Sequence, residues 1–199
     1  MKSVLIFLKL TTACMGLLFF MNSCGNNNDP ITVPSHDTAI IPNERADNTQ
    51  LTDPQIASIA VTANQIDIDY AKIAEQKGSN NDVKNFAKTM AKDHQDVINQ
   101  ATSLAEKLKL VPENNATTQS LLDNAANVRE KLNSLHGAEF DKFYIDNEVE
   151  YHKAAIDIVE NVLIPNSTNA ELKNLLSSAL PLFKMHLEHA QKVQAEINK

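Results

Sequence analysis

The sequence is poor in glycine and cysteine, and neither residue occurs where common functional motifs need it. Of the four glycines, only Gly78 and Gly137 follow Leu51. A nucleotide-binding glycine loop is therefore excluded from that part of the chain. Both cysteines, Cys14 and Cys24, lie near the start, and no Cys-x-x-Cys-His motif occurs, so covalently attached haem is excluded.

The chain is also short of positive charge. It carries 18 basic and 25 acidic residues, a net charge of −7. Removal of the segment 1–23 takes away Lys2 and Lys9 and changes the net charge from −7 to −9. A surface of this sign repels a phosphate backbone, so we expect no nucleic-acid partner.

The first residues resemble a bacterial lipoprotein signal peptide. Two lysines occur within the first nine residues, a mostly apolar run extends from Val4 to Met21, and Cys24 follows a small serine. We expect cleavage after residue 23 and lipidation of Cys24, which leaves no second cysteine for an intramolecular disulfide. Two alternatives stay open. One is a retained membrane anchor, because the apolar run is close to the length that spans a bilayer. The other is a soluble secreted protein.

Residues 24–50 are predicted to form a flexible polar tether. Asn, Asp, Thr and Pro dominate this stretch, and it has no helical period. Such a tether holds a folded domain, here residues 51–199, away from a membrane surface. Gly25 rather than aspartate follows Cys24, which in a Gram-negative cell favours delivery to the outer membrane. We therefore expect a protein of the cell envelope, attached to the membrane through lipid and facing the periplasm or the cell surface.

From Leu51 to the end, apolar residues recur at intervals of three and four, the period of helices that pack on one another. The first helix is expected to be capped at Asp53 with Pro54 as its first helical residue, and the last to begin with a capping box of Thr168 and Glu171. The pattern predicts five helices, over residues 53–78, 80–109, 117–135, 138–164 and 168–198.

These helix lengths predict an all-α fold, a ferritin-like four-helix bundle with a short extra helix in the crossover. Short connections at Gly78 and at Pro165-Asn166 join the long helices into two antiparallel hairpins. The short helix over 117–135 is long enough to carry the chain back along the bundle. The second and fourth predicted helices are therefore expected to run parallel to each other.

Three histidines occupy core-facing positions where apolar residues are expected. His94, His152 and His186 lie on the apolar stripes of three different long helices, each near the middle of its helix. Helix midpoints in an up-and-down bundle share one layer whichever way each helix runs, so we expect the three imidazoles to converge. His136, at a helix junction, and His189, at the edge of its stripe, are expected at the surface.

Acidic residues are placed to join the same layer. Asp67 and Asp69 flank the apolar stripe in the first helix, and Glu148 precedes His152 by four residues on one face. Three neutral imidazoles with one or two carboxylates suit zinc, iron, manganese or copper. Two alternatives stay open: a metal-free network in which the histidines hydrogen-bond to these carboxylates and to Tyr70, and, as the less favoured option, haem held by two histidines.

Three segments of the sequence resemble a known family. They read "VKNFAKTMAKDHQ", "FDKFYIDNEVEYHKAAI" and "LPLFKMHLEHA", and each carries one of the three core histidines. In this order they resemble the bacterial envelope family called domain of unknown function 4142, over residues 51–198. The resemblance implies a ferritin-like fold in an exported or lipidated protein. Members of that family usually carry glutamates where this chain has Asp67 and Asp69.

The sequence departs from the pattern of di-iron ferritins, which place a glutamate three residues before a histidine on two helices. Here the residues three before the core histidines are Ala91, Val149 and Phe183. A ferroxidase centre is therefore not expected, and no nucleophile paired with a base indicates an enzyme. We consider two functions: a lipid-anchored envelope bundle that binds a metal ion for storage, sensing or protection, and a non-enzymatic interaction or stress-response module whose core histidines are structural.

Overall fold

The computed structural model describes residues 50–199, and the expected signal peptide, the Cys24 lipidation site and nearly all of the expected tether lie outside these residues. The described part of the chain contains helices and no strand, which confirms the all-α prediction. In chain order the elements are α1 (Asp53–Lys77), α2 (Asn81–Leu108), α3 (Ala116–Ser134), α4 (Gly137–Ile158), the π-helical segment η1 (Val159–Leu163), α5 (Ile164–Asn166) and α6 (Ala170–Ile197).

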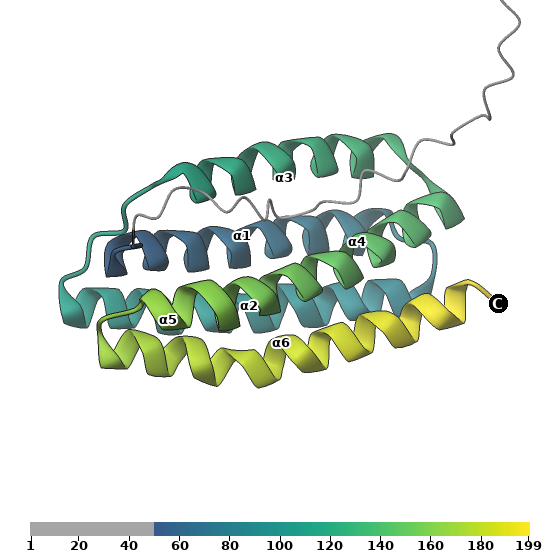
Figure 1. The fold of residues 1–199 in the computed structure, drawn as a ribbon. Coiled ribbons are helices and arrows are strands. Elements are labelled where there is room, and N and C mark those ends of the chain that lie inside the picture. The colour runs from purple at the N-terminus through teal and green to yellow at the C-terminus, as the bar shows by residue number, and fades with distance from the viewer. Residues whose placement is uncertain (1–49) are drawn as a thin grey trace, which may run out of the picture. The chain divides into compact units, whose positions relative to one another are not determined.

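The four long helices form two antiparallel hairpins, as predicted. α1 packs on α2, and α4 packs on α6 (Figure 1). α3 lies along α1 and returns the chain from the end of α2 to the start of α4 (Figure 1). α2 and α4 therefore run in the same direction, which is the one-crossover topology of a ferritin-like bundle.

The caps of α1 and α6 differ from the prediction. Thr52 caps α1, in a capping box with Gln55. Asp53, the expected cap, instead accepts hydrogen bonds from the backbone N–H groups of Thr168 and Asn169. Because Thr168 is committed to Asp53, the cap of α6 is Asn169, and the predicted capping box at that helix was wrong. These hydrogen bonds join the start of α1 to the start of α6.

The fourth long segment is not uniformly α-helical. The chain changes from α-helix to π-helix at Val159 and returns to α-helix after Leu163. Both of these residues are buried, so the π turn keeps an apolar contact with the core. The apolar period predicted one continuous helix there, because it does not distinguish a π turn from an α turn.

The core is built from the apolar stripes of the helices. Burial of each large aliphatic or aromatic side chain contributes about 1.5–3 kcal/mol. The fully buried apolar side chains include Ile56, Ile59, Phe86, Met90, Leu132, Phe140, Tyr144 and Ile145. The same interior also buries acidic and imidazole side chains, among them those of Asp67, His94, Glu148, His152 and His186.

Candidate metal centre

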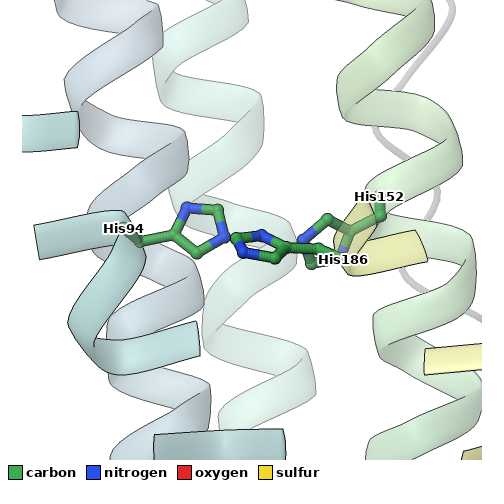
Figure 2. Close-up of side chains that lie close together, drawn as sticks. All are labelled: His94, His152 and His186. Atoms are coloured by element: carbon green, nitrogen blue, oxygen red, sulfur yellow. The ribbon is translucent and has the colours of Figure 1, made fainter. Parts of the chain in front are cut away.

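Three imidazoles from three helices meet in the middle of the bundle. His94 comes from α2, His152 from α4 and His186 from α6, and none is more than 4% exposed. Their ring centroids are 5.5, 5.1 and 5.4 Å apart, and Figure 2 shows the three rings gathered in one place. One ring nitrogen from each histidine lies within 4.8 Å of the other two. The predicted convergence is therefore confirmed.

The ring of His94 is oriented by Asn64 on α1. The Asn64 side-chain N–H donates to the carbonyl of Ala60 at 2.8 Å, which places Oδ1 of the amide toward His94. The distance from His94 Nδ1 to that oxygen is 2.7 Å. Since an amide oxygen only accepts, Nδ1 carries the proton. The lone pair of His94 is therefore on Nε2, the nitrogen that faces Asp67 at 3.3 Å.

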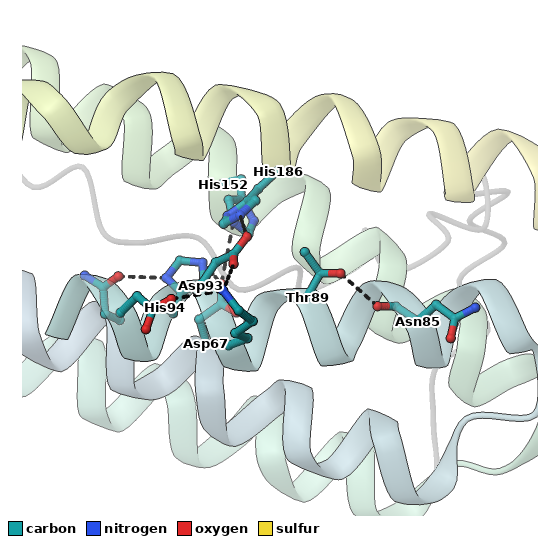
Figure 3. A network of polar contacts seen from close by, with 10 residues as sticks. Asp67, Asn85, Thr89, Asp93, His94, His152 and His186 are labelled. Atoms are coloured by element: carbon teal, nitrogen blue, oxygen red, sulfur yellow. Dashed lines mark hydrogen bonds and ion pairs between the residues drawn. The ribbon is translucent and has the colours of Figure 1, made fainter. Parts of the chain in front are cut away.

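The other two histidines are oriented in the same way. The Nδ1–H of His152 donates to the backbone carbonyl of Glu148 at 3.0 Å. The Nε2–H of His186 donates to Oδ2 of Asp93 at 3.2 Å (Figure 3). Each ring thus has one nitrogen committed to a hydrogen bond outside the cluster. The remaining nitrogens, Nε2 of His94 and His152 and Nδ1 of His186, have no hydrogen-bond partner. Histidines that bind metals are typically held in this manner.

Two carboxylates lie beside the imidazoles. Asp67 on α1 and Glu148 on α4 are completely buried, and none of their four carboxyl oxygens has a hydrogen-bond partner. The Asp67 Oδ2 atom is 3.7 Å from His152 Nε2, and Glu148 Oε2 is 3.5 Å from His152 Nδ1. Asp67, Glu148 and His152 form a second group whose ligand atoms lie within 4.8 Å of one another.

Burial holds the titratable groups of the centre close to neutral in the absence of a cation. Desolvation raises the pKa of Asp67 to about 8. Desolvation, followed by repulsion from Asp67, raises the pKa of Glu148 well above its usual value. Desolvation lowers the pKa of His152 to about 3, and it is also the main cause of the lowered pKa values of His94 and His186. Neutral imidazole is the form that coordinates metals.

An apolar pocket of about 70 Å³ adjoins the centre. His94, His152 and Asn64 line it together with aliphatic side chains such as Leu104 and Leu163. An apolar wall disfavours charged forms, which agrees with the directions of the pKa shifts.

One predicted candidate ligand does not belong to the centre. Asp69 is partly exposed, and its carboxylate pairs with Arg129 on α3 at 3.4 Å. A step of two residues turns a helix by about 200°, so Asp67 and Asp69 face different ways. Of the other histidines, His136 is exposed as predicted, whereas His189 is half-buried against the ring of Phe86, outside the cluster.

The sequence interpretation missed Asn64. It lies three residues before Asp67 and is buried on the same side of α1, a spacing that places two side chains together on a helix. A polar side chain one turn from a candidate ligand is the signal that points to it. The hydrogen bond to His94 is a tertiary contact, which the sequence alone does not indicate.

The chain belongs to a family defined by a domain of unknown function, DUF4142, whose model matches residues 41–193. This match confirms the family resemblance seen in the three histidine-bearing segments. No curated protein sequence matches the chain. Among the described residues, no helix combines the length and apolar character that crossing a membrane requires.

Solved structures share the fold at low sequence identity. A putative secreted protein, DUF305 from Streptomyces coelicolor, aligns with a TM-score of 0.60 and 12% identity, covering 72% of this chain and 92% of its own. CopM in a Cu(II)-bound form aligns at 0.56 and 16%, covering 74% and 99%. CopM in an Ag-bound form, obtained by soaking, aligns at 0.57 and 18%, covering 74% and 98%. At these identities the likeness concerns the fold alone.

Proposed function

We propose that this DUF4142 protein binds a single transition-metal ion in the middle of its bundle and serves in the cell envelope for metal storage, sensing or protection. The observation that carries the proposal is the presence of buried donor atoms without hydrogen-bond partners. They are one nitrogen from each of the three core histidines and the carboxyl oxygens of Asp67 and Glu148, and the residues fall into two groups of three that share His152.

A metal ion accounts for these atoms better than a metal-free polar network does. A buried polar atom without a hydrogen bond costs about 1–3 kcal/mol. The distances from Asp67 Oδ2 to Nε2 of His94 and His152 are 3.3 and 3.7 Å, longer than the roughly 2.7–3.0 Å of a good hydrogen bond. Two atoms that bind one ion at about 2.1 Å in tetrahedral geometry lie about 3.4 Å apart. The spacing of Asp67 and His152, which fall in one group of candidate ligands, therefore suits coordination of one shared ion.

The candidate ligands and the proteins of the same fold narrow the choice of metal ion. Imidazole and carboxylate ligands suit zinc, iron, manganese and copper. CopM, which shares the fold, is known in Cu(II)-bound and Ag-bound forms, so copper is the first metal to examine. A pocket of about 70 Å³ beside His94 and His152 is small for a haem macrocycle, which argues against haem.

The envelope location rests on the N-terminal sequence. The lysines, the apolar run and the serine before Cys24 support export, cleavage after residue 23 and attachment through lipid on Cys24. The DUF305 protein with the same fold is described as a putative secreted protein, which supports export. One acyl chain binds a membrane only marginally, so stable attachment needs a multiply acylated cysteine.

Thermal unfolding of protein purified without a histidine tag tests metal binding. A ligand that binds only the folded state stabilises it by about 2.7 kcal/mol at 100 times its dissociation constant, so Tm should rise when copper, zinc or iron is added. His94→Ala should lose most of this rise, and His136→Ala, at an exposed position, should retain it. A parent protein whose Tm does not respond to any of these metals would favour the interaction or stress-response module instead.

A further inference from the structure

The five buried donor residues do not form one set. They fall into two groups of three, and within each group the ligand atoms lie within 4.8 Å of one another. The imidazole group consists of His94, His152 and His186, and the carboxylate group consists of Asp67, Glu148 and His152. His152 belongs to both groups.

His152 has one lone pair to share between the groups. Its Nδ1–H donates to the backbone carbonyl of Glu148 at 3.0 Å, and its Nε2 has no hydrogen-bond partner. Because one neutral imidazole nitrogen coordinates one ion, His152 serves one group at a time. Binding in one group should therefore exclude binding in the other.

The two groups differ in donor chemistry and in charge. The imidazole group supplies neutral nitrogen ligands, which suit copper-like ions. The carboxylate group supplies oxygen ligands, which suit harder ions such as Mn(II). On ionisation, Asp67 and Glu148 together carry two negative charges, which balance one divalent cation in the apolar interior. Asp67 Oδ2 lies 3.3 Å from His94 Nε2, so the two positions are adjacent.

From these contacts we infer that the centre holds one ion in either of two positions, chosen by the ion's chemistry. Copper-like ions take the imidazole group, and hard divalent ions take the carboxylate group. The inference rests on the proposed metal-binding function and specifies its ligands: two classes of ion compete for one protein through His152.

Two conservative variants separate the positions. Glu148→Gln removes a carboxylate but leaves the backbone carbonyl that orients His152. His186→Gln removes an imidazole that is absent from the carboxylate group. Glu139→Gln and His136→Gln make the same changes at exposed positions of the chain and serve as matched controls.

The experiment uses the full untagged chain and two probe ions. Mn(II) binding is followed by loss of the free-ion signal in electron paramagnetic resonance. Ag(I), a redox-inert stand-in for Cu(I), is followed by its displacement of bound Mn(II) and by direct titration. Each Ag(I) should release one Mn(II) from the parent. Glu148→Gln should weaken Mn(II) binding about tenfold or more with Ag(I) little changed, and His186→Gln should do the reverse.

Three results would overturn the inference. In the first, Mn(II) and Ag(I) bind together without displacement. In the second, both variants weaken both ions alike, or neither variant discriminates between them, which leaves the proposed metal-binding function intact while removing the two positions. In the third, the parent binds neither ion nor any other transition metal, and the proposed function then fails as well.

Discussion

Asn64→Ala tests the orientation of the metal centre without removing any candidate ligand. The Asn64 amide accepts the Nδ1–H of His94 at 2.7 Å and is held in place by the Ala60 carbonyl. When the amide is removed, nothing fixes the proton on Nδ1. The His94 ring is then free to carry its proton on Nε2, which blocks the lone pair that faces Asp67.

The expected magnitude follows from that contact. A buried imidazole N–H left without an acceptor costs about 1–3 kcal/mol, so the metal-free protein should be destabilised by that amount. Loss of a residue that orients a metal-binding histidine usually weakens metal affinity by about 10–100-fold. This range corresponds to about 1.4–2.8 kcal/mol of binding free energy. Asn85→Ala, at an exposed position of α2, should change neither quantity appreciably.

Two measurements check the prediction. Nitrogen-15 NMR of the metal-free parent should show His94 protonated on Nδ1, and the variant should show a change toward Nε2 protonation. Isothermal titration with Ag(I), the probe for the imidazole group, should show weaker binding to Asn64→Ala than to the parent. The reasoning fails if His94 of the parent already carries its proton on Nε2. It also fails if Asn64→Ala changes neither the tautomer nor the metal affinity.

Three further predictions follow from the described contacts and the sequence. Without metal, the free energy of unfolding should fall between pH 6.5 and 8 in urea titrations. The folded-state pKa of Asp67 is raised to about 8 from its ordinary value of 3.8. The stability that protonated Asp67 gives the folded state is therefore fully present below pH 3.8 and is lost as pH rises through 8. This amounts to about 2 kcal/mol above pH 6.5. The opposite contribution of His152, whose pKa is lowered to about 3 from its ordinary 6.5, is largely complete there and adds less than about 0.5 kcal/mol at higher pH. A stability that stays flat over that window would contradict the pKa of Asp67. Asp93→Ala should weaken metal binding about tenfold, whereas Asp69→Ala should leave it unchanged; equal effects would mean that the Asp93–His186 hydrogen bond does not matter. Cys24→Ser should abolish lipid attachment, and intact-mass analysis of the native protein should show an acylated chain that starts at residue 24; the mass of the unmodified full-length chain would refute this.

Much of the fold was predictable from the spacing of apolar residues. The three-and-four period defined the long helices, and the segment that became α3 was long enough to carry the chain back along the bundle. The caps were harder to predict, because Thr52, Asp53, Thr168 and Asn169 are all good capping residues. The hydrogen bonds from the start of α6 to Asp53 decided between them, and those are tertiary contacts.

The site was predictable in outline and not in detail. Mid-helix register placed the three histidines in one layer, because helix midpoints coincide in a bundle. Asp67 and Asp69 flank the same stripe, and the sequence could not decide which one turns inward. In the structure Arg129 pairs with Asp69, while Asp67 reaches the histidines. The proton positions on the rings depend on Asn64 and other contacts between or within helices, which no periodicity encodes.

The metal content of the untagged protein is the most direct measurement of whether these histidines form a metal centre. The chain should be dialysed to equilibrium against micromolar copper, zinc, iron or manganese, and the bound metal then measured by elemental analysis alongside a variant with His94, His152 and His186 all changed to Ala. We predict one ion per parent chain for at least one of these metals and none for the variant. Parent protein that retains no metal, or a variant that retains as much as the parent, would contradict the account.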